Sequence, residues 1–458
     1  MTIQTCSSLV LWLGLIVLVC LGHSHPQSQQ QTSSGPLLLT PYLDRGDVGL
    51  ARNLSLVRFR PPTIVPLSYA GYLTVDRRVR NHLFFWFFPS PSNPSAPLLL
   101  WLNGGPAVSS MIGLFWEHGP MEVNYKLYGN SYGKRNHSWV GPFSVVYIDN
   151  PVGTGYSFSE TGTRGYKLDK EGYCHDLFHF VDQFFIMFPD LKDLELYIGG
   201  QSYAGKYIPP LAYRILSERN DINLKGIILG GPYFDPKTQS VAFFDYLYAV
   251  GAISHHDMNK HKNRVQAMYK EFLEGGNANK TFSQLFEQLV LLTDLPLPSL
   301  DNYVSGEEAN YSLVGEVMTT LDMRKAVHVG NQKYIVSNDN LSQCYGPDVM
   351  VSTKEELAQL MNNIKVLIYN GDYDVVVSSV MIEAAVMSTP WNGQEHYNRS
   401  MRNYWKQDKR LKGFYSRTGK FCRVVVHGGG HQTPHDVPDV TLEMVTDFLH
   451  HGCVQPKN

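Results

Sequence analysis

The sequence predicts an α/β fold in which a mostly parallel central sheet is flanked by helices. Five short apolar runs each lead into a glycine-rich turn, as expected of strands that are buried on both faces. These runs cover residues 98–102, 144–148, 194–198, 366–369 and 422–426. Helical patterns alternate with them, for example over 172–187 and 437–450. Ligands gather beyond the carboxyl ends of parallel strands, so we expect five loops to meet at one crevice.

The amino-terminal segment predicts entry into the secretory pathway. Residues 9–21 form an apolar run of 13 residues, which suits a signal peptide and is too short for a membrane span of about 20 residues. We expect residues 1–23 to be a signal peptide and the Gln/Ser-rich residues 24–36 to be a disordered spacer. A retained amino-terminal anchor is the alternative. No later apolar stretch reaches spanning length, so no membrane span is expected after signal removal.

The rest of the chain is predicted to be one α/β core with an insertion. Residues 68–88 hold two apolar runs around a polar DRR turn and predict a β-hairpin at a sheet edge. Between 239 and 324 the sequence becomes polar and helical, without comparable apolar runs. We therefore expect residues 37–238 and 325–458 to form the core and residues 239–324 to form a mainly helical cap.

The composition excludes two classes of protein. Of the 458 residues, 43% are hydrophobic and only 17% are charged, which is not the composition of an intrinsically disordered chain. The formal net charge is −2. Such a surface has no general attraction for phosphates, so a nucleic acid is not an expected partner. We therefore expect the chemistry to lie in a pocket.

Glycosylation sites and cysteines also indicate the secretory pathway. Six asparagines lie in Asn-X-Ser/Thr sites without proline at X: Asn53, Asn136, Asn279, Asn310, Asn340 and Asn398. Four cysteines lie beyond the signal peptide: Cys174, Cys344, Cys422 and Cys453. Four thiols allow three complete pairings, and the sequence does not choose among them. The protein is expected to be secreted or lysosomal.

The strongest local signal is a nucleophile elbow in the segment LYIGGQSYAGKYIPP. A predicted strand ends in a tight turn with Ser202 at its apex, and a helical pattern follows. The general form of the elbow is G-X-S-X-G, because the strained turn presses small neighbours against the serine. Gly200 fits this pattern, and Ala204 replaces the second glycine.

An acid and a base follow the serine in the order expected of α/β-hydrolases. Asp374 follows a predicted strand, and His431 follows the next. Neutral His431 would accept the proton of Ser202 during attack on a carbonyl carbon, and Asp374 would fix the imidazole tautomer. Position alone does not choose between Asp374 and Asp372. His427 is a weaker rival of His431, because it precedes the glycine turn and suits a structural role.

Eight separated blocks resemble the serine carboxypeptidases, and within them the vitellogenic-carboxypeptidase-like branch. They are AGYLTVD (70–76), WLNGGP (101–106), GLFWEHGP (113–120), YIDNPVGTGYSFS (147–159), GGQSYAGKYIPP (199–210), HVGNQ (328–332), IYNGDYD (368–374) and HGGGHQTP (427–434). The resemblance implies an α/β-hydrolase fold and a triad of Ser202, Asp374 and His431. It also implies hydrolysis of the last bond of a peptide or protein through an acyl-enzyme, without a cofactor.

The resemblance further assigns the groups around the triad. Main-chain amides of Gly105 and Tyr203 would form the oxyanion hole, where each donor contributes roughly 3 to 4 kcal/mol. The substrate's terminal carboxylate would be held by Asn103, Glu117 and Gln201, with Trp101 and Gly104 in supporting roles.

One departure from the family pattern concerns substrate binding. Gln201 stands where the family has glutamate. Two facing glutamates must share a proton to bind an anion, whereas a glutamine is always a donor. We expect Gln201 to donate one N–H to Glu117 and the other to the substrate, which would make binding less dependent on acid.

Further departures lie in two loops near the pocket. Ala107 and Val108 stand where the family usually has glycine followed by cysteine or another small residue. If the first position requires a positive φ, alanine costs about 1 kcal/mol or more. The customary partner of Cys344 is also missing, and GGPYFDP (230–236) replaces the usual GNGYxDP. These changes leave the triad unaltered.

Other functions have less support. The departures motivate a secreted pseudoenzyme that binds peptides, and the same triad suits an esterase or acyltransferase. His175 and His179 are four residues apart on a predicted helix, but no third metal ligand is evident and HExxH is absent. His255 and His256 are expected to be solvated. We expect neither a metal nor another cofactor, and the sequence does not indicate the oligomeric state.

Overall fold

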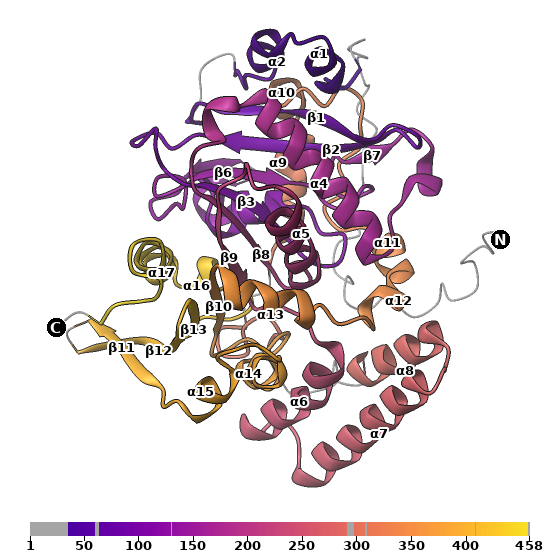
Figure 1. The fold of residues 1–458 in the computed structure, drawn as a ribbon, viewed down its shortest axis with the longest axis vertical. Helices are drawn as coiled ribbons and strands as arrows, with labels where there is room; N and C mark the ends of the chain where they lie inside the picture. The colour runs from indigo at the N-terminus through magenta and orange to yellow at the C-terminus, as the bar shows by residue number, and fades with distance from the viewer. Residues whose placement is uncertain are drawn as a thin grey trace.

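The computed structural model describes residues 35–59, 64–129, 131–290, 297–306, 309–407 and 409–456. The predicted signal peptide and most of the predicted spacer lie outside these residues. Near the start of the described residues, the amide of Leu37 donates to His328 O at 3.0 Å, which ties this segment to the rest of the fold. Figure 1 shows the sheet at the centre of the molecule with helices on both sides.

The central sheet is parallel in its middle and antiparallel at both edges. The parallel strands, in spatial order, are β6 (Ser144–Ile148), β3 (Leu98–Leu102), β8 (Leu196–Gln201), β9 (Leu224–Gly230), β10 (Lys365–Gly371) and β13 (Phe421–Val426). The antiparallel strands are β1 (Tyr69–Asp76) and β2 (Asn81–Phe88) at one edge, with β7 (Phe158–Ser159) beside β2, and β12 (Arg410–Thr418) and β11 (Asn403–Gln407) at the other. The predicted mostly parallel sheet and the hairpin at its edge are confirmed.

Each face of the sheet has its own hydrophobic core, because successive side chains of a strand point to opposite sides. In β3, Leu98, Leu100 and Leu102 pack into one core and Leu99 and Trp101 into the other. The first core includes residues of α4 (Lys170–Met187), α5 (Ala204–Glu218), α13 (Lys354–Asn363) and α14 (Ser379–Ser388). The second includes α9 (Tyr311–Thr319) and α17 (Pro438–His451).

The long connection from β9 to β10 is helical, and its described part contains no strand of the sheet. It holds α6 (Pro236–Ala249), α7 (His255–Leu273), α8 (Ala278–Val290), α9, α10 (Leu321–Ala326), α11 (Asp339–Cys344), α12 (Gly346–Val349) and α13. Figure 1 shows α6, α7 and α8 grouped at the lower end of the molecule, near α14. The boundaries 239 and 324 of a separate cap stay a prediction.

Short elements fill the remaining connections. They are α1 (Thr40–Asp44), α2 (Val48–Leu54), the π-helical turn η1 (Gly113–Glu117), β4 (Met121–Val123), α3 (Tyr125–Tyr128), β5 (Tyr132–Lys134), the 3₁₀ turns η2 (Gly162–Gly165) and η3 (Pro189–Leu191), α15 (Gln394–Arg399) and α16 (Thr433–Asp436). Among the described residues, no helix is both long and apolar enough to span a bilayer.

The cysteines and the glycosylation sites now have defined surroundings. A disulfide joins Cys422 in β13 to Cys453 after α17. Cys174 is a buried thiol, and burial raises its pKa to about 11, while Cys344 Sγ lies 3.3 Å from Asn340 O. All six asparagines of the glycosylation sites are exposed: Asn53, Asn136, Asn279, Asn310, Asn340 and Asn398.

Candidate active site

Ser202 lies at the apex of a strained turn between β8 and α5. Its φ is +59°, a conformation that L-residues rarely adopt outside such turns, and its amide donates to Gly230 O at 2.9 Å. A Cβ atom at Gly200 would lie 2.7 Å from Ala204 Cβ and 2.3 Å from Leu102 O. The glycine is therefore required before the serine, whereas alanine is accommodated after it. This geometry is that of a nucleophile elbow.

Asp374 and His431 form a buried pair beyond the ends of β10 and β13. His431 Nδ1 lies 2.9 Å from Asp374 Oδ2, and the side chains are 7% and 0% exposed. Because a carboxylate only accepts, Nδ1 is the donor and Nε2 is left for proton transfer. Burial favours the neutral imidazole, but the carboxylates of Asp374, Asp301 and Glu117 outweigh burial and raise the pKa of His431.

The two rivals that the sequence left open pair with each other instead. His427 Nδ1 lies 2.7 Å from Asp372 Oδ2, and Asp372 Oδ1 accepts from the Gly428 amide at 2.8 Å. These side chains are 45% and 26% exposed. The structure therefore brings Asp374, and not Asp372, to His431.

Ser202 and the Asp374–His431 pair share the same backbone neighbours. The amide of Ser202 bonds Gly230, and a Cβ atom on the next residue, Gly231, would lie 3.1 Å from Asp374 Oδ2 and 3.4 Å from His431 Nδ1. Within the described part of the chain, no hydrogen bond joins Ser202 Oγ to His431 Nε2. Catalytic hydrogen bonds are often long or poorly aligned until substrate binds.

The loop after β3 packs directly against the elbow. A Cβ atom at Gly104 would lie 2.4 Å from Tyr203 N and 3.0 Å from Ser202 Cβ, so no side chain fits there. Gly105 has a φ of +109°. Among the described residues, neither the Gly105 amide nor the Tyr203 amide donates a hydrogen bond to an acceptor. The two predicted oxyanion donors thus lie on adjacent, closely packed backbones.

Ala107 adopts the left-handed conformation that is costly for an L-residue. Its φ is +66°, its side chain is fully buried, and its carbonyl accepts from the Asn338 amide at 3.0 Å. The left-handed conformation costs an alanine about 1 kcal/mol relative to glycine. The loop nevertheless keeps its conformation, because a hydrogen bond spans Ala107: the Val108 amide donates to Gly104 O at 3.1 Å.

A buried polar group lies beside the elbow. Asn103 Nδ2 donates to Glu117 Oε1 at 2.7 Å, and Asn103 Oδ1 accepts from Trp101 Nε1 at 2.8 Å and from the Gly113 amide at 3.0 Å. Trp101 thus orients the asparagine amide. Glu117 is fully buried, its Oε2 has no partner among the described residues, and burial raises its pKa to about 7.

The expectation that Gln201 donates to Glu117 is wrong. Gln201 Nε2 donates to His431 O at 2.6 Å and to Gln432 Oε1 at 3.1 Å. Its Oε1 faces Asn103 Nδ2 at 3.4 Å. The reason is that Asn103 lies between Glu117 and Gln201 and its Nδ2 group donates toward both, so the glutamine presents its oxygen there. Gln201 therefore ties the elbow to the backbone of His431.

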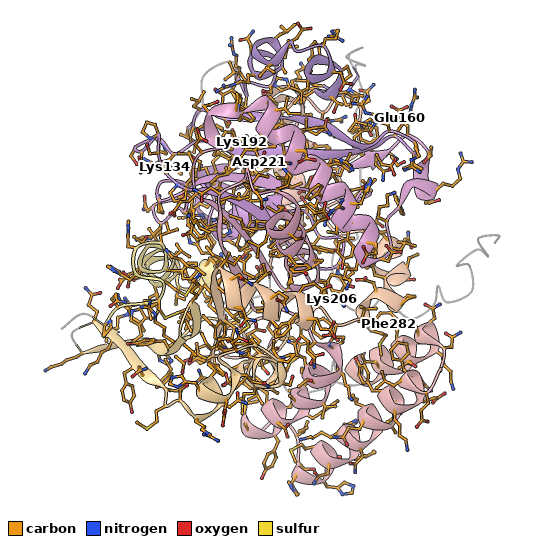
Figure 2. All side chains as sticks on the ribbon, in the orientation of Figure 1. Lys134, Glu160, Lys192, Lys206, Asp221 and Phe282 are labelled. Carbon is orange, nitrogen blue, oxygen red and sulfur yellow. A yellow bond between two sulfur atoms is a disulfide. The ribbon has the colours of Figure 1, made fainter. Side chains whose placement is uncertain are left out.

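A further buried group behind the elbow was not predicted. Tyr203 Oη donates to Asp348 Oδ2 at 2.6 Å, and the ammonium of Lys206 donates to Asp348 O at 2.8 Å. Figure 2 labels Lys206, one turn into α5. Burial lowers its pKa to about 8. The sequence offered no signal for Asp348, because it lies in the helical connection far from the elbow.

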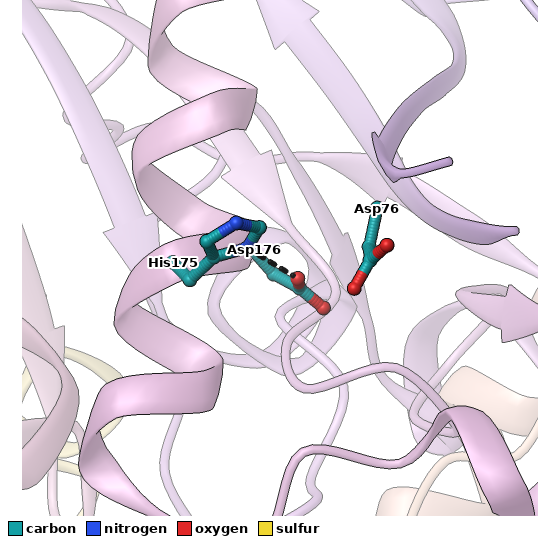
Figure 3. A group of neighbouring side chains, drawn as sticks. All are labelled: Asp76, His175 and Asp176. Atoms are coloured by element: carbon teal, nitrogen blue, oxygen red, sulfur yellow. Dashed lines mark hydrogen bonds and ion pairs between the residues drawn. The ribbon is translucent and has the colours of Figure 1, made fainter. Parts of the chain in front are cut away.

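His175 lies in a polar cluster on α4 and β1, away from the elbow. Figure 3 shows its ring beside Asp176, with the carboxylate of Asp76 facing them, and one ligand atom of each lies within 4.8 Å of the others. The cluster already has internal partners: Lys167 Nζ lies 2.8 Å from Asp76 Oδ2, and Asn81 Nδ2 lies 3.0 Å from Asp176 Oδ2. The sequence could not predict Asp76 as a member of this cluster, because Asp76 lies in β1 and His175 lies in α4.

The fold, the strained serine turn and the buried aspartate–histidine pair define an α/β-hydrolase. Residues 62–451 match the serine carboxypeptidase family. The chain is 36% identical to a probable serine carboxypeptidase, CPVL, from Homo sapiens over 91% of this chain and 90% of that protein. It is 32% identical to the vitellogenic carboxypeptidase of Aedes aegypti over 98% of this chain and 97% of that protein. The chain therefore belongs to the serine carboxypeptidase family and is a hydrolase of the exopeptidase type.

Two further comparisons agree. The venom serine carboxypeptidase of Apis mellifera is 32% identical, with 93% of each chain covered. The structure of Kex1Δp, a prohormone-processing carboxypeptidase from Saccharomyces cerevisiae, superposes with a TM-score of 0.77 at 20% identity, over 89% of this chain and 99% of that chain. The predicted α/β-hydrolase fold and the predicted family are thus confirmed.

Proposed function

We propose that Ser202, His431 and Asp374 form the catalytic triad of this carboxypeptidase. The observation that carries this proposal is the buried 2.9 Å contact between His431 and Asp374 beside the strained serine. His431 Nε2 takes the proton of Ser202 Oγ as the oxygen attacks the scissile carbonyl carbon, and then gives that proton to the leaving amine. Water attacks the resulting acyl-enzyme by the same route, which releases the shortened peptide and restores the serine.

The amides of Gly105 and Tyr203 stabilise the oxyanion of each tetrahedral intermediate. Two observations support this role: a Cβ atom at Gly104 would lie 2.4 Å from Tyr203 N, and Tyr203 opens the helix that follows the serine. Amide hydrogens at a helix start attract negative charge. The anchoring of the Tyr203 side chain on Asp348 holds one of these donors in place before substrate arrives.

Glu117 binds the terminal carboxylate of the substrate in its protonated form. Asn103 has already used its amide group on Glu117 Oε1 and Gln201 Oε1, and Gln201 has used its own on the loop of His431. Glu117 Oε2 is the oxygen of this group that has no partner among the described residues. A neutral carboxyl there donates to an anion, whereas an ionised one repels it. The supporting roles of Trp101 and Gly104 are to hold Asn103 and the oxyanion loop.

We also infer passage through the secretory pathway to a lysosomal or extracellular destination. The Cys422–Cys453 disulfide and the exposure of all six glycosylation asparagines support it, since disulfides persist in oxidising compartments. A relative at 32% identity is named a venom carboxypeptidase. Treatment of the expressed protein with an endoglycosidase is expected to increase its mobility on a denaturing gel, and an unchanged mobility would contradict glycosylation.

The triad proposal is tested with a peptide library digested by the mature chain and by a Ser202→Ala variant. We expect loss of carboxyl-terminal residues with the wild type alone, and no cleavage of the same peptides once their ends are amidated. Cleavage of amidated peptides or of simple esters without preference for a free carboxylate would indicate an esterase. Binding without turnover, together with no labelling of Ser202 by a fluorophosphonate, would indicate a pseudoenzyme.

A further inference from the structure

The polar cluster on α4 and β1 has no part in the proposed mechanism. It consists of His175, Asp176 and Asp76, and each offers one nitrogen or carboxylate oxygen atom that lies within 4.8 Å of the other two (Figure 3). The sequence places His175 four residues before His179 but shows no third metal ligand. The fold supplies carboxylates, because β1 packs against α4 and brings Asp76 to the helix.

The donor atoms of this cluster suit a zinc ion. Zinc binds imidazole nitrogen and carboxylate oxygen at about 2.0 to 2.2 Å, usually as a tetrahedron, so its ligand atoms lie about 3.4 Å apart. His175 Nδ1 already lies 3.2 Å from Asp176 Oδ1, and the ion would take the place of the hydrogen between them. Calcium and magnesium prefer oxygen ligands alone. The imidazole therefore favours zinc over both.

The structure already places a cation at this cluster. Lys167 Nζ lies 2.8 Å from Asp76 Oδ2. Burial opposes ionisation of Asp76, but this ammonium and the Arg78 amide hold the pKa of that carboxyl below its usual value. Burial nevertheless raises the pKa of Asp176, as expected where one ammonium serves two acids. A divalent ion would compensate both carboxylates, and the flexible stem of Lys167 lets its ammonium leave toward solvent.

An open cavity of about 350 Å³ gives access to the cluster. Asp76, His175 and His179 are among the residues that line it, while Asp176 lies behind with a side chain that is 2% exposed. A water molecule occupies about 30 Å³, so the cavity has an entry path for a hydrated ion and space for a water ligand. The rings of His175 and His179 have centroids 4.4 Å apart, but His179 is not a member of the close group of ligand atoms.

We infer that His175, Asp176 and Asp76 bind a zinc ion, with water as the fourth ligand and the ammonium of Lys167 displaced. The ion joins β1, at the edge of the sheet, to α4, which packs against it, and so stabilises this edge of the fold. The inference is independent of the proposed function, because it uses neither the triad nor the groups assigned to the substrate's carboxylate.

The test is calorimetric titration of the untagged mature protein, freed of metal with a chelator, with Zn²⁺ alone. We expect one ion per chain with a Kd of about 1 µM or lower. Because the ion binds the folded chain, the unfolding temperature is expected to rise as zinc is added. The absence of zinc binding, with an unchanged unfolding temperature, would overturn the inference and leave the proposed function intact.

Three variants locate the ion. His175→Ala and Asp76→Asn are each expected to weaken zinc binding by at least about tenfold, since each removes a ligand. Lys167→Met is expected to tighten it severalfold, because it removes the competing ammonium. The unfolding temperature of each variant without zinc checks that it folds. An unchanged Kd in both ligand variants would refute the assignment.

His179→Ala is the matched control, because His179 lies on the same helix and lines the same cavity without belonging to the ligand group. Its Kd for zinc is expected to stay within about threefold of the wild-type value, since no ligand is lost. Loss of binding in His179→Ala together with retention in Asp76→Asn would assign the ion to the helical histidine pair alone and overturn the inference. Ser202→Ala is expected to bind zinc as the wild type does, and loss of binding there would place the ion at the active site instead.

Discussion

The active-site loops contain two aspartate–histidine pairs that differ mainly in burial. In one, Asp374 and His431 are 0% and 7% exposed; in the other, Asp372 and His427 are 26% and 45% exposed. The contact distances are similar, 2.9 and 2.7 Å. Burial strengthens a charge interaction and excludes water, and the first, buried pair is the one that we propose to act with Ser202. The exposed pair instead fixes the start of the glycine-rich loop that leads to His431, because Asp372 also accepts from the Gly428 amide at 2.8 Å.

The largest effect is expected when the two acids are replaced in turn. Asp374→Asn keeps the shape of the pair but favours the wrong imidazole tautomer, and it is expected to lower kcat by about 10⁴-fold. Asp372→Asn is expected to change kcat by less than about threefold, since surface pairs contribute little. Steady-state rates on one peptide, with thermal unfolding as a check on folding, measure both. Similar losses of kcat in the two variants would contradict the distinction between the buried and the exposed pair.

Glu117 extends the comparison to a third acid, which is fully buried and, among the residues that the structure describes, has no positively charged partner in hydrogen-bond contact. Its pKa of about 7 means that the protonated donor is present below pH 7 and is lost above it. We expect KM to be constant at acid pH and to rise by up to about tenfold per pH unit above pH 7. Glu117→Gln keeps a donor at all pH values and is expected to remove the rise. A KM that rises identically in this variant would assign the effect to another group.

A substitution at Gln201 tests whether the Asp374–His431 pair requires an uncharged side chain at this neighbouring position. In Gln201→Glu, a carboxylate would face the oxygen atoms of His431 and Gln432, which now accept from Gln201 Nε2. The variant is therefore expected to lose kcat/KM as its new carboxyl ionises, so that its optimum moves to lower pH than that of the wild type. The pH profile of kcat/KM between about pH 4 and 7.5 measures this shift. Superimposable profiles would show that the amide is dispensable.

The smallest effect concerns the oxyanion loop. Ala107 has a φ of +66°, and Ala107→Gly relieves the strain but increases the entropy of the unfolded chain, so a net gain of about 0.5 kcal/mol in the free energy of unfolding is expected. Denaturant unfolding of the two proteins measures it. A loss of stability would show that packing of the buried Ala107 methyl group contributes more free energy than the strained backbone costs.

The sequence predicted the parallel strands and the serine turn, because buried strands and strained turns restrict which residues occur locally. It missed β9, since a strand buried between β8 and β10 carries no motif. It also missed β11, whose residues are mostly exposed. The choice between Asp372 and Asp374 depends on which histidine each side chain meets in space. The Cys422–Cys453 disulfide and the position of Gln201 likewise depend on contacts between residues that are far apart in the chain.

The most direct test of the buried pair is the rate at which a fluorophosphonate labels Ser202, followed by intact mass and peptide mapping. The wild type and His427→Ala are expected to be labelled at Ser202 at rates within about threefold of each other. His431→Ala is expected to react more slowly by about 10³-fold or more, because the serine has lost its base. Equal labelling of Ser202 in His431→Ala and the wild type would contradict the account.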